Sequence, residues 1–321
     1  MDEYLQQLTI ERSEQRIVLR SPAKINLFLE PLAKRADGYH EIVTVMQTID
    51  LCDEVAIELT DDGIELECDH PDVPSGPENL AWRAAEAFMA DAGIKLGVRI
   101  GLRKRIPPGG GLGGGSSNAA IALLGLSELT GRPLTRGQLA EVAASLGSDV
   151  PFFLCGGTAL CTGRGEQVEA LRPAPAFWVI LVIAPFSVST AEAYRRFTFV
   201  LTHRQSARRI LASVRRSDLR LLLGSLHNGL AEAVLSAWPP LRDLWEEVVS
   251  GGLPHPQVSG SGSTLYGVCC TEAEAAEVAV RLRGRLPREV LVAVARNRLA
   301  SAKEEHNGDH RSQNQSEGGR Q

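Results

Sequence analysis

A run of glycines constrains the fold of this chain more than any other segment. Residues 107–120 read Pro-Pro-Gly-Gly-Gly-Leu-Gly-Gly-Gly-Ser-Ser-Asn-Ala-Ala, in which six glycines surround one leucine. The preceding segment alternates as a strand does, at Val98, Ile100 and Leu102, and apolar residues follow the run at helical spacing. Glycine allows positive φ and a close approach to backbone amides, and a helix N-terminus offers unpaired N–H donors. Strand, glycines and helix together predict a polyphosphate site, because a flexible linker would have polar, aperiodic flanks.

We refer to residues 107–117 as the glycine loop. This loop lacks the G-K-[ST] ending of a Walker loop, and its glycines are spaced differently from the dinucleotide fingerprint G-x-G-x-x-G. The ligand that we expect is therefore ATP, held by a fold of another kind.

Composition indicates an ordinary globular protein. The 321 residues suit two domains or one large one, and a net charge of −5 gives no overall attraction to nucleic acid or to an anionic membrane. The longest apolar run, 177–185, has the length of a buried strand, and the acidic N-terminus does not resemble a signal peptide, so we expect a cytoplasmic protein. The six cysteines lie mostly in apolar segments without a C-x-x-C pair, as core residues do.

The first half of the chain is rich in predicted strands. They are expected at 16–20, 25–30, 43–50, 54–59, 64–68, 151–154 and 158–161. Helices are expected at 79–92, 116–130 and 135–146, where Thr135 and Gln138 have the spacing of a capping box. Proline and alanine at 171–176 indicate a domain boundary.

The second half mixes strands and helices. Strands are expected at 177–184, 265–270 and 289–295. Helices are expected at 191–197, 208–215, 219–223, 228–236, 241–249 and 272–282. This mixed order predicts an α+β fold, and residues 303–321 contain no apolar side chain and are expected to be disordered.

Four further segments contain candidate functional residues, and each has a structural alternative. Lys24 is either a snorkelling surface lysine or a desolvated functional one, and Asp149 is either a turn aspartate or a carboxylate that needs a partner in apolar surroundings. Tyr39 and His40 follow an Asp-Gly turn and could simply pack behind it. The glycines and serines at 259–264 form either a tight loop or a second anion-binding nest.

Together these segments resemble the GHMP kinases, a superfamily of small-molecule kinases. The likeness lies in S-P-A-K-I-N-L-F-L, R-A-D-G-Y-H-E-I, the glycine loop, L-G-S-D-V-P-F-F and V-S-G-S-G-S-T, in matching order from about residue 17 to 300. The resemblance implies a mixed sheet with helices, like ribosomal protein S5 domain 2, then an α/β sandwich, with the active site in the cleft between them. The implied divisions are an extension at 1–15, domains at 16–172 and 173–300, and a polar tail at 301–321.

R-A-D-G-Y-H is similar to the cytidine-binding strand and turn of one branch of this superfamily. That branch phosphorylates the tertiary 2-hydroxyl of a cytidine diphosphate ester of methylerythritol with ATP and Mg²⁺, in the non-mevalonate route to isoprenoids. The alternatives are a homoserine, mevalonate or sugar kinase, which Tyr39 and His40 argue against, and a ligand-sensing relative without activity, which Lys24 and Asp149 argue against. The partner is then a small molecule, not nucleic acid, despite eight arginines within 195–220.

The resemblance also implies roles for individual residues. Asp149 is the catalytic aspartate and Lys24 its partner, while Ser116 and Ser117 offer hydroxyls to phosphate or Mg²⁺. The ATP-binding set is Lys104, Pro107, Pro108, Gly109, Gly110, Gly111, Leu112, Gly113, Gly114, Gly115, Ser116 and Ser117. Asn26, Tyr39, His40 and Tyr194 are expected to bind the cytidylyl substrate.

Three departures from the usual pattern, Pro108, Ser187 and the lack of an expected aspartate in His227-Asn-Gly229, leave open the aromatic partner and any role of the Asn228 region. The ring that stacks opposite Tyr39 is Tyr194, Phe186 or Phe197. A monomer and a homodimer are both compatible with the sequence.

Overall fold

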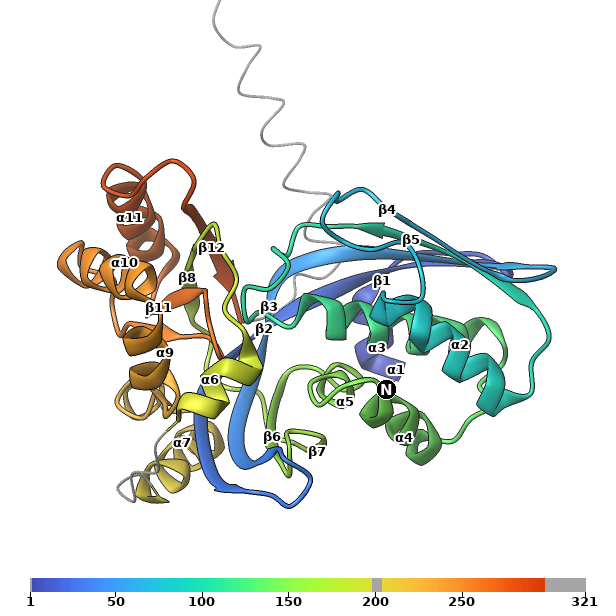
Figure 1. The fold of residues 1–321 in the computed structure, drawn as a ribbon, viewed down its shortest axis with the longest axis horizontal. Coiled ribbons are helices and arrows are strands. Elements are labelled where there is room, and N and C mark those ends of the chain that lie inside the picture. Colours follow the sequence, from blue (N-terminus) through green and yellow to red (C-terminus); the bar gives the residue numbers. More distant parts are fainter. Residues whose placement is uncertain (1, 198–203, 298–321) are drawn as a thin grey trace, which may run out of the picture.

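Two long strands connect the halves of the molecule. In the computed structural model, which describes residues 2–197 and 204–297, β2 (Arg16–Lys34) pairs antiparallel with β3 (His40–Thr60) (Figure 1). We expected four shorter strands here. Both strands are continuous because the register shifts between Pro22 and Ala23, and a bulge accommodates a proline that lacks a backbone donor.

These strands form the centre of a mixed sheet. Its order is β1 (Thr9–Arg12), β2, β3, β5 (Gly97–Arg103) and β4 (Ile64–Cys68). β6 (Thr158–Thr162) pairs with β3 and with β7 (Gln167–Ala170), and β9 (His227–Asn228) pairs with β2. The β4–β5 and β2–β9 pairs are parallel and the others antiparallel, which confirms the predicted mixed sheet.

Helices cover one face of this sheet (Figure 1). They are α1 (Asp2–Leu8), α2 (Leu80–Ala92), α3 (Gly114–Leu129), α4 (Arg136–Leu146) and α5 (Val150–Phe153). The predicted starts of two helices are confirmed: Asn79 caps α2 by accepting from the N–H of Ala81, and Thr135 and Gln138 form the capping box of α4. The helix expected at 116–130 begins earlier, at Gly114, so the last glycines of the glycine loop lie in its first turn. Their apolar faces form one core with the sheet, and Leu5 and Leu8 of α1 join it, so the expected extension packs on the first sheet.

The segment after Asp149 is a short helix, and our expectation of a strand at 151–154 was wrong. Pro151 lies in the first turn of α5, where its missing N–H costs nothing. Phe152 and Phe153 are both fully buried, so this turn anchors Asp149 against the core.

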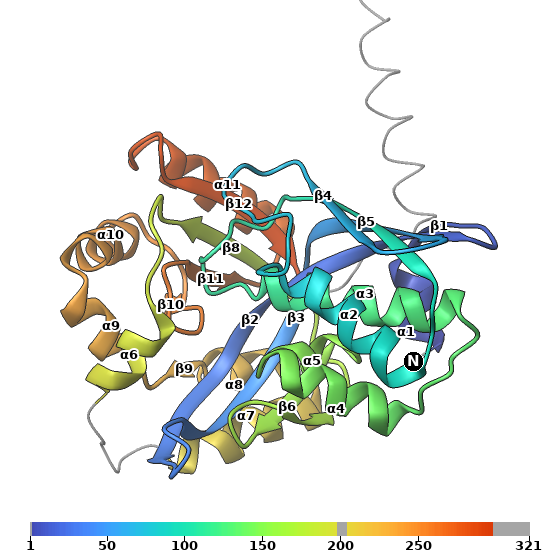
Figure 2. The ribbon, with the colours of Figure 1, turned by 45° about the vertical axis from the view of Figure 1, so that its right-hand side comes forward.

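The second half of the chain forms a smaller antiparallel sheet. Its order is β10 (Gln257–Val258), β11 (Leu265–Cys269), β8 (Trp178–Ile183) and β12 (Leu291–Arg296). Its helices are α6 (Thr190–Arg196), α7 (Arg204–Arg216), α8 (Leu219–Leu223), α9 (Ala231–Ala237), α10 (Pro239–Ser250) and α11 (Glu272–Arg283). Figure 2 shows β2 and β3 running between this sheet and the helices of the first half.

Asn228 precedes its helix, whereas we expected a helix over 228–236. Its side-chain amide donates to the carbonyl oxygens of Val258 (2.8 Å) and Gly260 (2.7 Å), and its oxygen accepts from Leu230 N–H (2.9 Å). These bonds hold His227 and Asn228 beside β2 and delay the start of α9 to Ala231.

A shared core joins the two sheets. Ile25 and Phe28 of β2 pack in one cluster with Val179 and Leu181 of β8, and Tyr266 of β11 belongs to the same cluster. β2 is therefore buried on both faces along most of its length. The expected domain boundary, 171–176, runs between β7 and β8, and the expected tail at 301–321 lies outside the described residues.

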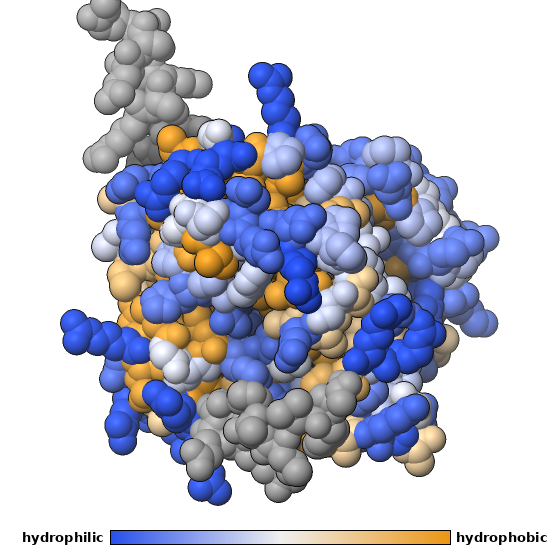
Figure 3. Space-filling model, turned by 60° about the vertical axis from the view of Figure 1, so that its left-hand side comes forward, coloured by the Kyte–Doolittle hydropathy of each residue, from blue (hydrophilic) through white to orange (hydrophobic). Residues whose placement is uncertain are grey.

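One face of the molecule is mostly polar (Figure 3). Figure 3 shows hydrophilic side chains over much of the side that carries the second sheet's helices, with smaller apolar patches between them. Across residues 2–197 and 204–297, no helix is long and apolar enough to cross a membrane.

Candidate active site

A cavity of about 1180 Å³ lies between the two halves of the molecule. The glycine loop lines one side, and the turn around Tyr39 and residues of α6 line another. The sequence-predicted residues that line it are Lys24, Asn26, Tyr39, His40, Pro107, Pro108, Gly109, Gly110, Gly111, Leu112, Gly113, Gly114, Gly115, Ser116, Asp149 and Tyr194.

Glycine is required within the loop for two reasons. Gly109, Gly111 and Gly113 have φ of 72°, 75° and 73°, in the left-handed region that other residues avoid. A Cβ on Gly111 would also lie 2.3 Å from the carbonyl oxygen of Ser259, so the loop packs directly against the 259–264 segment.

Three carbonyl groups of the loop accept hydrogen bonds from other segments of the protein. Gly110 O accepts from Thr264 N (3.1 Å), Gly111 O from Ser259 Oγ (3.0 Å) and Leu112 O from Lys24 N (2.9 Å). Within the described ranges, no backbone hydrogen bond is donated by residues 109–113. The loop then enters α3, whose N-cap Gly113 has no side chain to cap the first turn. The arrangement leaves a row of N–H donors for an anion.

Lys24 is a buried lysine at the floor of the site. Its side chain is 5% exposed, and Nζ lies 3.5 Å from Asp149 Oδ2 and donates to Asn26 Oδ1 at 2.7 Å. Asn26 Nδ2 in turn donates to Thr44 Oγ1 (2.8 Å), which fixes the orientation of the amide. The Asp149 side chain is 32% exposed, so it has access to a ligand. Lys24 is therefore a buried, desolvated lysine and not a snorkelling surface one.

The predicted aromatic residues form two separate contacts. Tyr39 is 54% exposed, and the guanidinium carbon of Arg164 lies 4.9 Å from the centre of its ring. His40 packs instead against Tyr194, with ring centres 5.2 Å apart, and against the edge of Phe197 at 6.4 Å. Phe186 packs against the second sheet's core and is absent from the described cavity lining.

Burial shifts the titration of two of these groups. The pKa of His40 lies below its usual value of 6.5, first because burial disfavours the imidazolium and then because Lys34 repels it. The pKa of Tyr194 is raised by burial and by the negative charge of Asp149. His40 is therefore uncharged at neutral pH.

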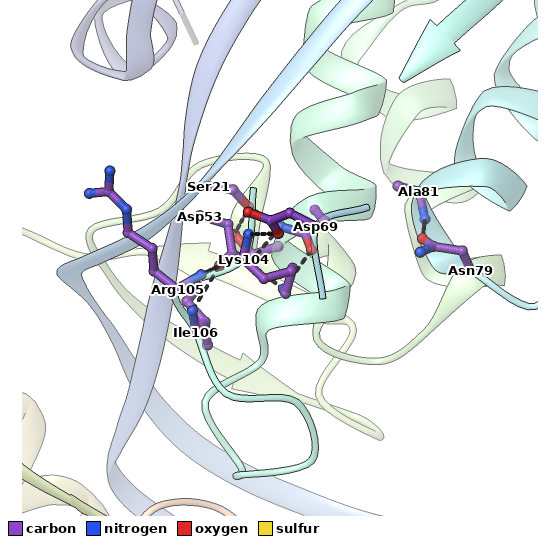
Figure 4. Close-up of polar contacts among 10 residues, drawn as sticks. Ser21, Asp53, Asp69, Asn79, Ala81, Lys104, Arg105 and Ile106 are labelled. Carbon is purple, nitrogen blue, oxygen red and sulfur yellow. Dashed lines mark hydrogen bonds and ion pairs between the residues drawn. The ribbon is translucent and has the colours of Figure 1, made fainter. Parts of the chain in front are cut away.

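Two predicted residues, Lys104 and Ser117, are not in the described lining of the cavity. The Lys104 side chain is 3% exposed, forms an ion pair with Asp53 and donates to Asn118 Oδ1 at 2.9 Å (Figure 4). Ser117 is fully buried, and its Oγ accepts from Ser21 Oγ at 2.8 Å. Lys104 lies behind the glycine loop, where its Nζ would be 3.4 Å from a Cβ on Gly114, and Ser117 is the loop's last residue, inside α3.

Sequence reasoning missed several residues near the site. Arg164 and Leu80 line the cavity, and Asp53 is the fully buried acid behind it. A glycine on each side of Arg164 was a signal for a tight turn, and an acid between two predicted strands, directly before the second, was a signal at Asp53. Neither signal indicates which distant side chains Arg164 and Asp53 contact.

Comparisons with known proteins agree with this geometry. Residues 79–157 match the family model described as the GHMP kinases N terminal domain. The 4-diphosphocytidyl-2-C-methyl-D-erythritol kinase of Geobacter metallireducens is 41% identical over 260 residues, covering 81% of this chain and 91% of that protein. The enzyme of the same name from Brevibacillus brevis is 42% identical over 272 residues, covering 84% and 93%.

Solved structures show the same fold. A crystal structure of 4-(cytidine 5'-diphospho)-2C-methyl-D-erythritol kinase has a TM-score of 0.70 and 32% identity, covering 87% of this chain and 98% of that chain. Homoserine kinase from Cytophaga hutchinsonii has a TM-score of 0.71 at 18% identity, which shows the fold alone. The predicted two-part α+β kinase fold is confirmed, and the chain belongs to the 4-diphosphocytidyl-2-C-methyl-D-erythritol kinase family of the GHMP kinases.

Proposed function

We propose that this protein transfers the γ-phosphoryl group of ATP to the 2-hydroxyl of 4-diphosphocytidyl-2-C-methyl-D-erythritol, giving the 2-phosphate and ADP. One observation supports this proposal most directly. A single cavity contains both the unpaired N–H groups of the glycine loop and the Lys24–Asp149 pair, so phosphate donor and acceptor can meet there.

The glycine loop and α3 are suited to hold the phosphates of ATP. Their N–H groups offer partial positive charge to the phosphates. Three carbonyl oxygens of the loop are bonded to other segments, so they do not turn toward the phosphates and repel them. Positioning and charge stabilisation account for most of the catalysis in phosphoryl transfer.

Asp149 and Lys24 are the groups that we propose act on the reacting atoms. Asp149 accepts the proton of the 2-hydroxyl, or aligns it, as the oxygen forms a bond to the γ-phosphorus and the bond to ADP breaks. Lys24 supplies positive charge beside Asp149 and beside the transferring phosphoryl group. Asn26 Oδ1 holds the Lys24 ammonium in place by accepting a hydrogen bond from it.

The residues in the cavity also fit a magnesium ion bound with ATP. The Ser116 hydroxyl is a hard oxygen donor beside the loop, which is the donor type that Mg²⁺ prefers, and the phosphates of ATP would supply further oxygen donors. When bound, Mg²⁺ neutralises charge on the β- and γ-phosphates.

Tyr39, His40, Tyr194 and Asn26 are the residues that we propose bind the cytidylyl substrate. Tyr39 offers an exposed ring for stacking on the base. Uncharged His40 has one donor and one acceptor nitrogen, which suits the polar edge of cytosine, and Tyr194 packs against this imidazole. The six cysteines lie mostly in apolar segments without a C-x-x-C pair, which suits the cytoplasm, and we propose that compartment for a monomer or homodimer.

Replacement of Asp149 tests the catalytic proposal. We expect Asp149→Asn to lower kcat by about 10²-fold or more with nucleotide affinity within about threefold, because general-base catalysis contributes roughly 10²–10⁴-fold. ADP release measured with a coupled assay gives kcat, and calorimetry gives the ATP affinity. Asp243→Asn, an exposed change on α10, is the matched control. A turnover rate of Asp149→Asn equal to that of the control would contradict the proposed role.

A further inference from the structure

A buried carboxylate lies where the glycine loop leaves the first sheet. Asp53 of β3 has no exposed surface and is absent from the described cavity lining (Figure 4). Its Oδ1 accepts from the backbone N–H groups of Arg105 (2.7 Å) and Ile106 (2.8 Å). Its Oδ2 accepts from Asn118 Nδ2 (2.9 Å) and pairs with the Lys104 ammonium. Four donors around one carboxylate offset the cost of burying its charge.

These donors come from the two ends of the glycine loop. Arg105 and Ile106 directly precede Pro107, and Asn118 directly follows Ser117 on α3. One side chain therefore fixes both the entry to the loop and the first turns of the helix that follows it.

The hydroxyl of Ser21 extends this contact to β2. Ser21 pairs with Asp53 across the two strands, accepts from Asn118 Nδ2 (2.9 Å) and donates to Ser117 Oγ (2.8 Å). The helix start is thereby tied to both long strands of the sheet.

The loop between these ends has little stiffness of its own. Gly109, Gly111 and Gly113 each have positive φ, and glycine has more conformational freedom to lose than any other residue. N–H groups stabilise developing charge well only when they are already oriented. The carbonyl bonds of Gly110, Gly111 and Leu112 hold the middle of the loop, and contacts at its two ends set where the loop starts and finishes.

We infer that Asp53 is a positioning residue for ATP, which acts through Arg105, Ile106 and Asn118 without touching the nucleotide. Lys104 neutralises the buried carboxylate in this arrangement. The inference rests on the proposed function only for the identity of the nucleotide, because the contacts of Asp53 would orient the loop for any polyphosphate.

A charge exchange between positions 53 and 118 tests this role. Asp53→Asn places an amide group against Lys104 Nζ and Asn118 Nδ2, so donors face donors. We expect it to weaken ATP binding by about 10-fold, because small misplacements of binding groups can cost up to about 10²-fold. The pair Asp53→Asn with Asn118→Asp restores a carboxylate beside Lys104, and we expect ATP affinity within about threefold of the original protein.

Calorimetric titration with Mg-ATP alone measures these affinities without an acceptor. Because no acceptor is present, the outcome is independent of whether the cytidylyl compound is the substrate. Val248→Ala, which opens a cavity in the second sheet's core, is the control for general destabilisation. Should Asp53→Asn prove insoluble, Ser21→Ala removes one link of the same network, and we expect it to weaken ATP binding by about threefold.

The outcomes separate positioning from mere structural support. Weakened ATP binding in Asp53→Asn, recovered in the exchanged pair and absent in Val248→Ala, supports the inference. A lower melting temperature with unchanged ATP affinity in Asp53→Asn would overturn it. Equal losses of ATP affinity in Asp53→Asn and Val248→Ala would overturn it as well.

Discussion

At the scale of single residues, Lys24 shows how contacts within the fold determine whether a lysine is buried or exposed. Its sequence neighbours are compatible with either a surface lysine or a desolvated one. A desolvated lysine needs a charged partner, and that partner, Asp149, lies far along the chain. A buried ammonium needs acceptors, and Asn26 and Asp149 are both within reach of Nζ. Lys24 and Asp149 could be identified as candidates from sequence, whereas their pairing required the fold.

Arg164 is expected to orient Tyr39 for stacking. Its guanidinium covers one face of the Tyr39 ring and leaves the other for a base. We expect Arg164→Ala to raise KM for the cytidylyl substrate by about two- to fivefold with kcat unchanged, since an exposed cation–π contact contributes about 0.5–1 kcal/mol. Arg164→Lys keeps the cation and is the control. Steady-state kinetics with unchanged KM in Arg164→Ala would refute this role.

His40 predicts a pH dependence of substrate binding. Its pKa in the folded protein lies below 6.5, so the neutral ring persists into mildly acidic solution. Unfolding then takes up a proton below pH 6.5, and the stability present above that pH falls as the pH drops toward the lowered pKa. We expect KM for the cytidylyl substrate to rise at lower pH, as the pH falls through the lowered pKa of His40 in the folded protein. His40→Gln should remove this rise, and a rise that persists in His40→Gln would contradict the assignment.

At the scale of elements, features that depend on neighbouring residues could be predicted from the sequence. Features that depend on contacts with distant strands could not. The ends of α2 and α4 were predictable because Asn79 and Thr135 cap their own helices. α5 was mistaken for a strand because two adjacent phenylalanines fit either element. The continuity of β2 was missed because Pro22 is accommodated by a bulge that depends on β3.

Gly111 tests how closely the glycine loop must pack. A Cβ there would meet the backbone of Ser259 and Gly262 and would require a disfavoured φ. We expect Gly111→Ala to weaken ATP binding by at least about 10-fold, because strain and displacement of the loop act together. Gly137→Ala is the matched control, since its Cβ would meet nothing within 4 Å. ATP affinity of Gly111→Ala equal to that of the control would show that the loop tolerates a side chain.

At the scale of the whole molecule, the site depends on β2 belonging to both cores. This strand brings Lys24 and Asn26 to the cavity, and Tyr266 from the second sheet donates to Asn26 O at 2.7 Å. The two-part α+β fold could be predicted from the order of elements and the resemblance. The contacts that join the parts could not, because they link residues distant in sequence.

The most direct test is to identify the phosphorylated product. Phosphorus NMR of the protein with Mg-ATP and 4-diphosphocytidyl-2-C-methyl-D-erythritol should show a new phosphomonoester at the 2-position and one ADP for each product molecule. Homoserine and mevalonate should yield no product under the same conditions. Phosphorylation of either compound at a comparable rate, or ATP loss without an acceptor product, would contradict the proposed function.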